Sequence, residues 1–257
     1  MTKATFWIRR DAGSAPFPAT VWVPTDTPAE PELGSASAPA PLVLLGHGGS
    51  GHRHSPRIVA LATKFAESGI AAVAIDDPYH GERAASPAPP IPAEYQARMI
   101  ADGIDKVLDG MAADWLATCD ALAEAGIADR TRLAYCGLSL ATRLGLPTAA
   151  ALGPTLRCAV FGKFAPNSPA LPPGLSAPAR TLRDASRIAA PVLFHMQWDD
   201  ELFPRHAQLD LFDAFPSPAK ELHAHPGPHA RTPPHAPATW YAFIARQLRP
   251  TAAKSDC

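Results

Sequence analysis

Short apolar runs alternate along the chain with longer segments in which apolar residues recur at helical spacing. The runs predict strands, and they cover residues 42–45, 70–75, 132–136, 156–161 and 192–195. A helical segment at 55–68 follows the first run, and Gly69 is placed to end that helix. Strands that alternate with helices in this way predict an α/β fold with a mostly parallel sheet.

Both ends of the chain fit the same organisation. Residues 5–8 and 19–23 predict two opening strands, and the glycine and proline between them favour an antiparallel pair at a sheet edge. The remaining predicted elements are two helices, a strand and a closing helix, at 93–108, 111–125, 220–223 and 238–248. The pattern contains no internal repeat, and a single domain over residues 1–257 accounts for the length.

Three segments without apolar periodicity predict loops. Residues 25–41 are expected to form a surface loop with no chemistry of its own. The proline-rich residues 84–92 belong to a long excursion after the strand at 70–75, and long excursions in compact domains are often functional. A second proline-rich insert begins at Ala165, and we expect residues 165–184 to form a short lid.

Composition and charge narrow the class of protein. Of the 257 residues, 47% are hydrophobic and 18% are charged, which is enough to bury a sizeable core and excludes a disordered chain. The 23 Lys and Arg residues are balanced by 24 Asp and Glu, so no basic excess is available to neutralise nucleic-acid phosphates. Nucleic acid is therefore not an expected partner.

The sequence also bears on compartment and redox state. The first ten residues lack the apolar run of a secretory signal, and no stretch reaches the roughly 18 apolar residues that would span a membrane. We therefore expect a cytoplasmic protein with no membrane contact. Free thiols are expected, because no C-x-x-C pair occurs among the four cysteines, which are Cys119, Cys136, Cys158 and Cys257.

Candidate chemistry begins at Gly137-Leu-Ser139-Leu-Ala141, where a predicted strand runs directly into a helical segment. A nucleophile on such a strained turn needs small residues two before and two after it, and Gly137 and Ala141 meet that need. Alanine stands where glycine is usual. The pattern predicts Ser139 as a nucleophile; the alternative is a serine that only caps the following helix.

Through this motif the chain resembles the α/β-hydrolase superfamily, and more narrowly its dienelactone hydrolase-like serine esterase branch, from about Leu42 onward. The resemblance implies a mostly parallel central sheet of about eight strands, with helices on both faces and at most a short lid. It also implies that the catalytic residues follow in the order serine, acid, histidine.

The expected acid follows the strand that ends near Trp198. Hydrolases of this family commonly place the aspartate four residues before a proline, and Asp200 stands in that relation to Pro204. An aspartate there would accept a hydrogen bond from the catalytic imidazole and fix its tautomer. Asp199 is the alternative, and a turn or helix cap is its expected role.

Three histidines lie at the end of the last predicted strand and just after it, and the family places the catalytic one directly after a glycine-bearing loop. His229 fits that position and would act as general base and then as general acid. We expect His223 to lie in the strand and His225 to support the loop. For both, a plain surface histidine is the alternative.

The sequence His47-Gly-Gly49-Ser50 resembles the family's oxyanion loop. By that resemblance, Gly49 and Leu140 would each direct a backbone N–H at the substrate's carbonyl oxygen, while His47 orders the loop. The alternative is an ordinary strand-end turn at Gly48 and Gly49.

Two further groups of residues bear on the site. The segment Asp76-Asp-Pro-Tyr-His-Gly-Glu-Arg83 looks like a family stretch that lines or braces the site, and an internal ion pair that only holds the loop accounts for it equally well. Aromatic residues near the predicted strand ends are candidates for substrate contact, with plain core packing as the alternative; they are Tyr79, Trp198 and Phe203.

The histidine-rich pieces around His47 and His229 offer imidazole groups, which commonly bind metals, but neither piece has H-E-x-x-H spacing. We expect no metal and no cofactor. The sequence thus predicts a serine hydrolase acting on small or medium carboxylic esters. A lactone, dienelactone or thioester hydrolase on the same triad is the alternative; a metal-dependent hydrolase and a non-catalytic binding protein are less favoured. The oligomeric state is left open.

Overall fold

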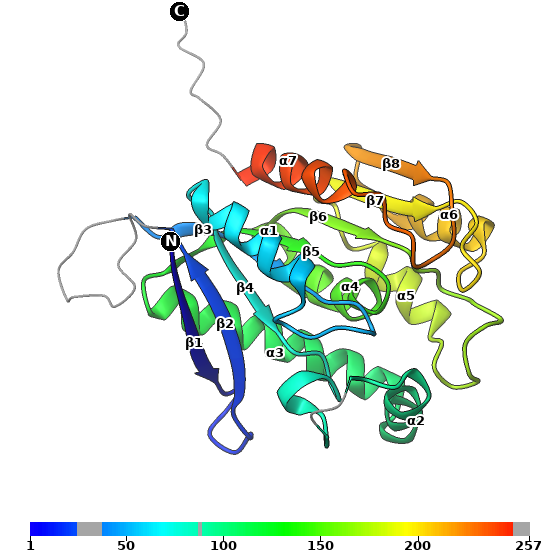
Figure 1. Cartoon of the computed structure of the whole chain (residues 1–257), viewed down its shortest axis with the longest axis horizontal. Coiled ribbons are helices and arrows are strands. Elements are labelled where there is room, and N and C mark those ends of the chain that lie inside the picture. The colour runs from blue at the N-terminus through cyan, green and yellow to red at the C-terminus, as the bar shows by residue number, and fades with distance from the viewer. Residues whose placement is uncertain (25–37, 87–88, 249–257) are drawn as a thin grey trace, which may run out of the picture.

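The centre of the molecule is a mostly parallel sheet, seen in a computed structural model that describes residues 1–24, 38–86 and 89–248. Its eight strands lie in the order β1-β2-β4-β3-β5-β6-β7-β8 (Figure 1). β2 pairs antiparallel with both β1 and β4, and the pairs from β4 to β8 are parallel. The strands are β1 (Thr2–Ile8), β2 (Phe17–Val23), β3 (Ala40–Leu45), β4 (Ala71–Ile75), β5 (Ala128–Cys136), β6 (Leu156–Gly162), β7 (Val192–Gln197) and β8 (Lys220–His225).

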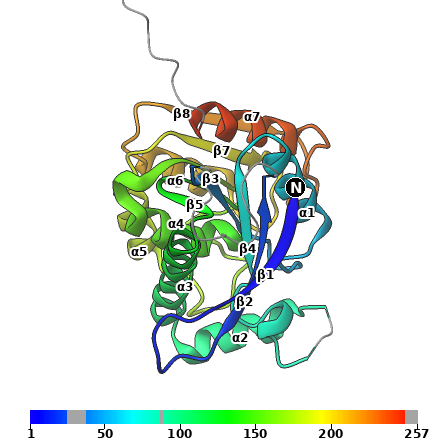
Figure 2. The ribbon, with the colours of Figure 1, turned by 90° about the vertical axis from the view of Figure 1, so that its left-hand side faces the viewer.

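Helices cover both faces of this sheet, which completes the three layers seen in Figures 1 and 2. α1 and α7 pack on one face, and α3, α4, α5 and α6 pack on the other. The helices are α1 (Pro56–Glu67), α2 (Pro92–Asp102), α3 (Ile104–Glu124), α4 (Leu140–Leu152), α5 (Pro178–Ala185), α6 (Arg205–Ala214) and α7 (Ala236–Leu248). This arrangement confirms the predicted fold class.

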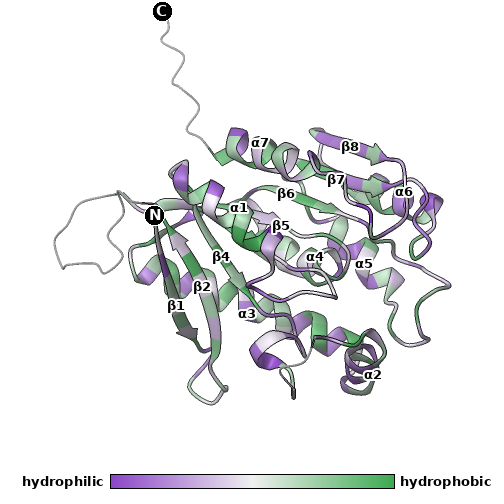
Figure 3. Ribbon diagram, viewed as in Figure 1, coloured by the Kyte–Doolittle hydropathy of each residue, from purple (hydrophilic) through white to green (hydrophobic). Residues whose placement is uncertain are grey.

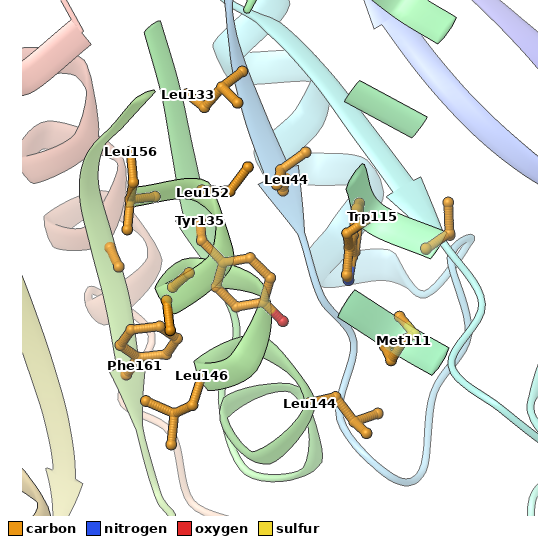
Figure 4. Packing of buried hydrophobic residues seen from close by; sticks show 14 of the residues in the cluster. Leu44, Met111, Trp115, Leu133, Tyr135, Leu144, Leu146, Leu152, Leu156 and Phe161 are labelled. Atoms are coloured by element: carbon orange, nitrogen blue, oxygen red, sulfur yellow. The ribbon is translucent and has the colours of Figure 1, made fainter. Parts of the chain in front are cut away.

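Each face of the sheet buries its own apolar cluster. On the face of α3 and α4, Tyr135 packs 5.5 Å from Phe161 and 6.1 Å from Trp115, measured between ring centroids (Figure 4). The strands β3, β4 and β6 are correspondingly hydrophobic over most of their length (Figure 3). Because each buried large apolar side chain contributes about 1.5–3 kcal/mol, this packing fixes the ends of the central strands.

The break between two helices and the start of β5 differ clearly from the sequence-based expectations. The two helices predicted at 93–108 and 111–125 break at Gly103 and not near residue 110. Gly103 has a φ of 85°, which a side chain would resist, whereas Gly110 has ordinary helical geometry inside α3. β5 starts at Ala128, four residues earlier than the predicted strand, because Ala128 pairs with Ala40 of β3 despite the polar residues that follow it.

The expected lid at 165–184 divides into two parts. Residues from 178 onward form α5, which packs against α4 and α6 as part of the helical layer. Residues 165–177 connect β6 to that helix, and a lid role for them, as for residues 84–92, stays a prediction. Most of the loop expected at 25–41 lies outside the described residues.

Other expectations can be compared with the described part of the chain. Cys119, Cys136 and Cys158 are buried and free, whereas Cys257 lies outside the described residues. Within the ranges described above, no helix has both the length and the apolar character needed to cross a bilayer.

Candidate active site

The predicted nucleophile lies on a sharp turn between β5 and α4. Ser139 has a φ of 61° and a ψ of −119°, a conformation that costs a non-glycine residue about 1–3 kcal/mol. Its backbone N–H donates to the carbonyl of Gly162 at 2.9 Å, which ties the turn to the end of β6. The turn therefore has the strained geometry expected of a nucleophile elbow.

Small residues allow strand and helix to meet at this turn. A methyl group added at Gly137 or at Gly46 would lie 2.7 Å from the Cβ of Ala141. The alanine that replaces the usual glycine is accommodated because both positions facing it lack a side chain. The Tyr135 hydroxyl also donates to the Ala141 carbonyl at 2.7 Å and holds the first turn of α4 against β5.

The three predicted catalytic side chains form one continuous chain of hydrogen bonds. Ser139 Oγ is 3.0 Å from His229 Nε2, and His229 Nδ1 is 2.9 Å from Asp200 Oδ2. Asp200 follows β7 and His229 follows β8, so the carboxyl ends of the parallel strands bring them together. Since a carboxylate accepts, Nδ1 carries the proton and Nε2 is left free to accept from the serine hydroxyl.

Asp200 is held by more than the histidine. Its Oδ1 accepts from the backbone N–H groups of Leu202 and Phe203, each at 2.9 Å. The Gln208 amide lies 3.4 Å from Oδ2, and the Asp200 side chain is only 1% exposed. These donors stabilise the ionised carboxylate in its orientation toward His229.

The loop that carries His229 is fastened by residues that follow β7. Asp199 accepts from the Gly227 N–H at 3.0 Å, which agrees with its expected turn role, and Glu201 accepts from the His229 N–H at 2.8 Å. That second hydrogen bond lowers the pKa of Glu201. Gln197 donates from its amide to the Arg231 carbonyl at 2.7 Å, so the loop is held on both sides of the histidine.

Lys163 supports the same loop from the end of β6. This lysine has a φ of 51°, is 6% exposed, and donates from Nζ to Thr232 Oγ1 at 3.1 Å. Burial lowers the pKa of the ammonium group to about 8. Sequence analysis missed Lys163, Gln197 and Glu201, because only the fold brings these positions beside residues 229–232.

The expected oxyanion loop follows β3 and faces the start of α4. A methyl group added at Gly49 would lie 3.7 Å from Leu140 Cδ2, which places the two expected donors on neighbouring segments. Within the described residues, the backbone N–H groups of Gly49 and Leu140 have no acceptor. They are therefore free to donate to a bound carbonyl oxygen.

His47 orders this loop, as expected, and does not reach the triad. Its Nδ1 lies 2.9 Å from the Gly48 carbonyl, and its Nε2 accepts from the Asp77 N–H at 2.9 Å. Burial lowers the pKa of His47 to about 4, so the ring is neutral and these two bonds define its tautomer. Burial also raises the pKa of the neighbouring Asp77 carboxyl to about 7.

The 76–83 segment braces the loops behind the site. Asp76 accepts from the backbone N–H of Arg53 at 2.8 Å and forms a buried ion pair with its guanidinium. Arg83 pairs with Asp114 of α3 at 2.8 Å. The ion pairs therefore join the segment to Arg53 and to α3, and are not internal to it as the ion-pair alternative expected; in this way the segment braces the loop.

The three aromatic candidates for substrate contact lie in different surroundings. The ring of Phe203 is 5.6 Å from that of His229, which places it beside the triad. Tyr79 donates a hydrogen bond to Asp102 and lines a cavity of about 280 Å³ together with residues of α2. Trp198 is 44% exposed and stacks at 3.9 Å under Arg205, so it is a surface residue.

The histidine-rich pieces do not assemble into a metal centre in the part of the chain that the structure describes, where no group of three or more His, Cys, Asp or Glu side chains has the spacing to hold an ion. His223 lies in β8 and contacts Glu221 at 3.2 Å. His225, at the end of that strand, stacks 4.7 Å from the ring of the buried His195.

The mostly parallel eight-stranded sheet, with a strained serine on the turn after a central strand, is the α/β-hydrolase fold. No family model matches the chain, and no curated protein does. Solved structures do match over nearly its whole length. A PEG-bound cold-adapted esterase from an Arctic intertidal metagenomic library is 28% identical over 96% of this chain and 93% of its own, with a TM-score of 0.75.

Two other solved structures share the fold at lower identity. A protein from Klebsiella pneumoniae subsp. pneumoniae, assigned as a dienelactone hydrolase, is 20% identical over 96% of this chain and 99% of its own, with a TM-score of 0.69. A puromycin-hydrolyzing peptidase of Mycobacterium tuberculosis is 22% identical over 96% of this chain and 40% of its own, with a TM-score of 0.68. These two likenesses show the shared fold, and the 28%-identical esterase supports an enzyme of the hydrolase type.

Proposed function

We propose that the protein is a serine hydrolase that cleaves small to medium carboxylic esters through an acyl-enzyme intermediate. The observation that carries this proposal is the unbroken chain from Asp200 through His229 to Ser139, with hydrogen-bond distances of 2.9 and 3.0 Å. Similarity to the cold-adapted esterase supports the same activity. The reaction needs no cofactor, because all of its proton transfers can be made by these side chains.

In the first half of the reaction, Ser139 Oγ attacks the ester carbonyl while His229 Nε2 takes the hydroxyl proton. Negative charge develops on the carbonyl oxygen, and the free N–H groups of Gly49 and Leu140 stabilise it. The imidazolium that forms is stabilised by Asp200, which lies 2.9 Å from Nδ1. His229 then returns the proton to the departing alcohol, leaving an acyl group on Ser139.

In the second half, a water molecule gives a proton to His229 and attacks the acyl-enzyme. The carboxylic acid leaves as the proton returns to Ser139 Oγ, which restores the resting enzyme. The connection at residues 165–177 is short, and for that reason we propose direct access for soluble esters over interfacial action on long-chain lipids. Lactones and thioesters present the same carbonyl to the serine and belong in the substrate series.

The test is hydrolysis of p-nitrophenyl esters from acetate to a long-chain acyl group, with a lactone and a thioester in parallel. Ser139→Ala should lower kcat by about four to six orders of magnitude, since the nucleophile is lost. A matched control is Ser186→Ala, which removes an exposed hydroxyl bonded only to the Arg183 carbonyl at 2.8 Å. Activity that survives in Ser139→Ala, or that a chelator abolishes, would refute the serine mechanism.

A further inference from the structure

Arg143 is a buried cation without a countercharge. It lies in α4, is 7% exposed, and contacts the ring of Phe164 with its guanidinium 5.2 Å from the centroid. No carboxylate and no hydrogen-bond acceptor in the described part of the chain contacts its side chain. By contrast, the equally buried Arg53 pairs with Asp76 and Glu82. An unpaired buried charge is expensive, so buried arginines are normally paired in this way.

The guanidinium nitrogens of Arg143 also remain open to a partner. Within the described residues they have no hydrogen-bond acceptor, and they are not fully sealed from solvent. Burial lowers the pKa of the group only to about 10, so it is positively charged at neutral pH. The side chain therefore offers charged donors just beneath the protein surface.

This charge lies close to the nucleophile. Arg143 is in the first turn of the helix that Ser139 caps, and its backbone N–H donates to the Ser139 carbonyl at 3.2 Å. Helical side chains lean toward the helix N-terminus, where Ser139 lies. A series of rings leads from Arg143 to the triad: Phe164 lies 5.2 Å from Phe203, which lies 5.6 Å from His229.

The other side of Arg143 faces the oxyanion loop. Tyr95 of α2 is close enough to raise the pKa of the guanidinium electrostatically. The hydroxyl of the same tyrosine abuts Gly49, because a methyl group added at that glycine would overlap it. Arg143 is thus enclosed between the ring series that ends at His229 and the tyrosine that touches Gly49.

We propose that Arg143 binds a free carboxylate of the substrate, so that the preferred esters are half-esters of short dicarboxylic acids. This proposal rests on the proposed ester hydrolysis. Four residues of helix span about 6 Å, which matches a carboxylate about two to four carbon atoms from the scissile carbonyl. A planar guanidinium can hold that carboxylate through two parallel hydrogen bonds. The reaction is unchanged: the alcohol leaves with the proton from His229, and water releases the dicarboxylic acid from Ser139.

The test compares monoethyl glutarate with ethyl valerate, which differ only in a terminal carboxylate or methyl group, by the rate of ethanol release. The wild type should favour the glutarate half-ester in kcat/KM. Arg143→Met should lower the glutarate-to-valerate ratio about ten- to a hundred-fold, the size of a hydrogen-bonded charge pair, while valerate turnover stays within about three-fold. Arg143→Lys keeps the positive charge but cannot form two parallel hydrogen bonds to one carboxylate, so it should give an intermediate ratio.

Two controls separate recognition from packing. Arg246→Met removes another cation, one that lies over the ring of Phe243 in α7 on the opposite face of the sheet, and should leave the ratio within about two-fold. Glutarate binding, followed by calorimetry on wild type and Arg143→Met, does not depend on turnover. An unchanged ratio in Arg143→Met and Arg143→Lys, or equal glutarate binding by wild type and Arg143→Met, would overturn the proposal. A protein that binds glutarate through Arg143 but hydrolyses no ester would instead refute the proposed function alone.

Discussion

A single methyl group at Gly49 should disable the oxyanion loop. The Cβ of an alanine there would overlap the Tyr95 hydroxyl and lie 3.2 Å from Tyr95 Cζ. Tyr95 is 9% exposed and packs 4.5 Å from the ring of His80, so it has little room to withdraw. The loop must move instead, and its free N–H group moves with it.

The expected loss follows from what one oxyanion donor contributes. Removing such a donor typically lowers kcat by about 10²–10³, or about 3–4 kcal/mol in the transition state, and leaves substrate binding nearly unchanged. Gly48→Ala is the matched control, because its added methyl group would meet no atom closer than 3.9 Å. We therefore expect Gly49→Ala to lower kcat by at least about a hundred-fold and Gly48→Ala by less than about three-fold.

The assay is steady-state hydrolysis of a short-chain p-nitrophenyl ester by both variants, with thermal unfolding to confirm that they fold. Tyr95→Phe in the Gly49→Ala background removes the overlapping oxygen and should restore part of kcat, while Cζ at 3.2 Å still limits the fit. Equal kcat for Gly49→Ala and Gly48→Ala, or no recovery in the double variant, would refute this account of the loop.

Two further predictions concern stability. Because the folded-state pKa of His47 is about 4 and its ordinary value is 6.5, the folded protein binds fewer protons than the unfolded chain between these values. The neutral His47 therefore contributes up to about 3 kcal/mol to the free energy of unfolding above pH 6.5, and this contribution is lost toward pH 4. Asp77, whose pKa is raised, opposes this trend. The measurement is urea unfolding of the wild type and of His47→Asn at pH 7 and pH 4.5, and parallel pH dependences of the two proteins would contradict the prediction. Gly110→Ala should stabilise α3 by about 0.5–1 kcal/mol, since the added methyl group lies 3.6 Å from Arg10 Nη1 and meets no closer atom. In Gly145→Ala the methyl group would overlap the Tyr135 ring, so this variant should lower the stability of the protein. A higher melting temperature for Gly145→Ala than for Gly110→Ala would be inconsistent with this packing.

The features that sequence analysis predicted well are local or follow from chain order. The turn at Ser139 is encoded by the small residues beside it, and the acid and histidine follow at the ends of later strands. The helix break was misplaced because two glycines, Gly103 and Gly110, look alike in sequence and differ only in φ. No periodicity rule distinguishes a glycine needed for a left-handed turn from one tolerated inside a helix.

The features that sequence analysis missed depend on contacts between distant segments. Lys163 supports the histidine loop by donating to Thr232, which lies 69 positions later in the chain, and the residues next to Lys163 in the sequence give no indication of that role. Arg143 is a similar case, because its lack of a carboxylate partner within the described residues is visible only once its neighbours are placed. Burial of a charged residue is the informative observation, and it requires the fold.

Different interactions hold Ser139 and His229 in place, and their strengths indicate which of the two is more easily displaced by substitution. The strain at Ser139 costs about 1–3 kcal/mol, but Leu144 and Leu146 of the following helix are 0% and 1% exposed and together contribute about 3–6 kcal/mol of burial. Packing of α4 therefore holds the nucleophile in its strained position. His229 packs beside the ring of Phe203, but its loop is held by single hydrogen bonds, such as the one from Gln197, each worth about 1 kcal/mol. Substitutions around that loop should therefore misplace the base before they unfold the domain.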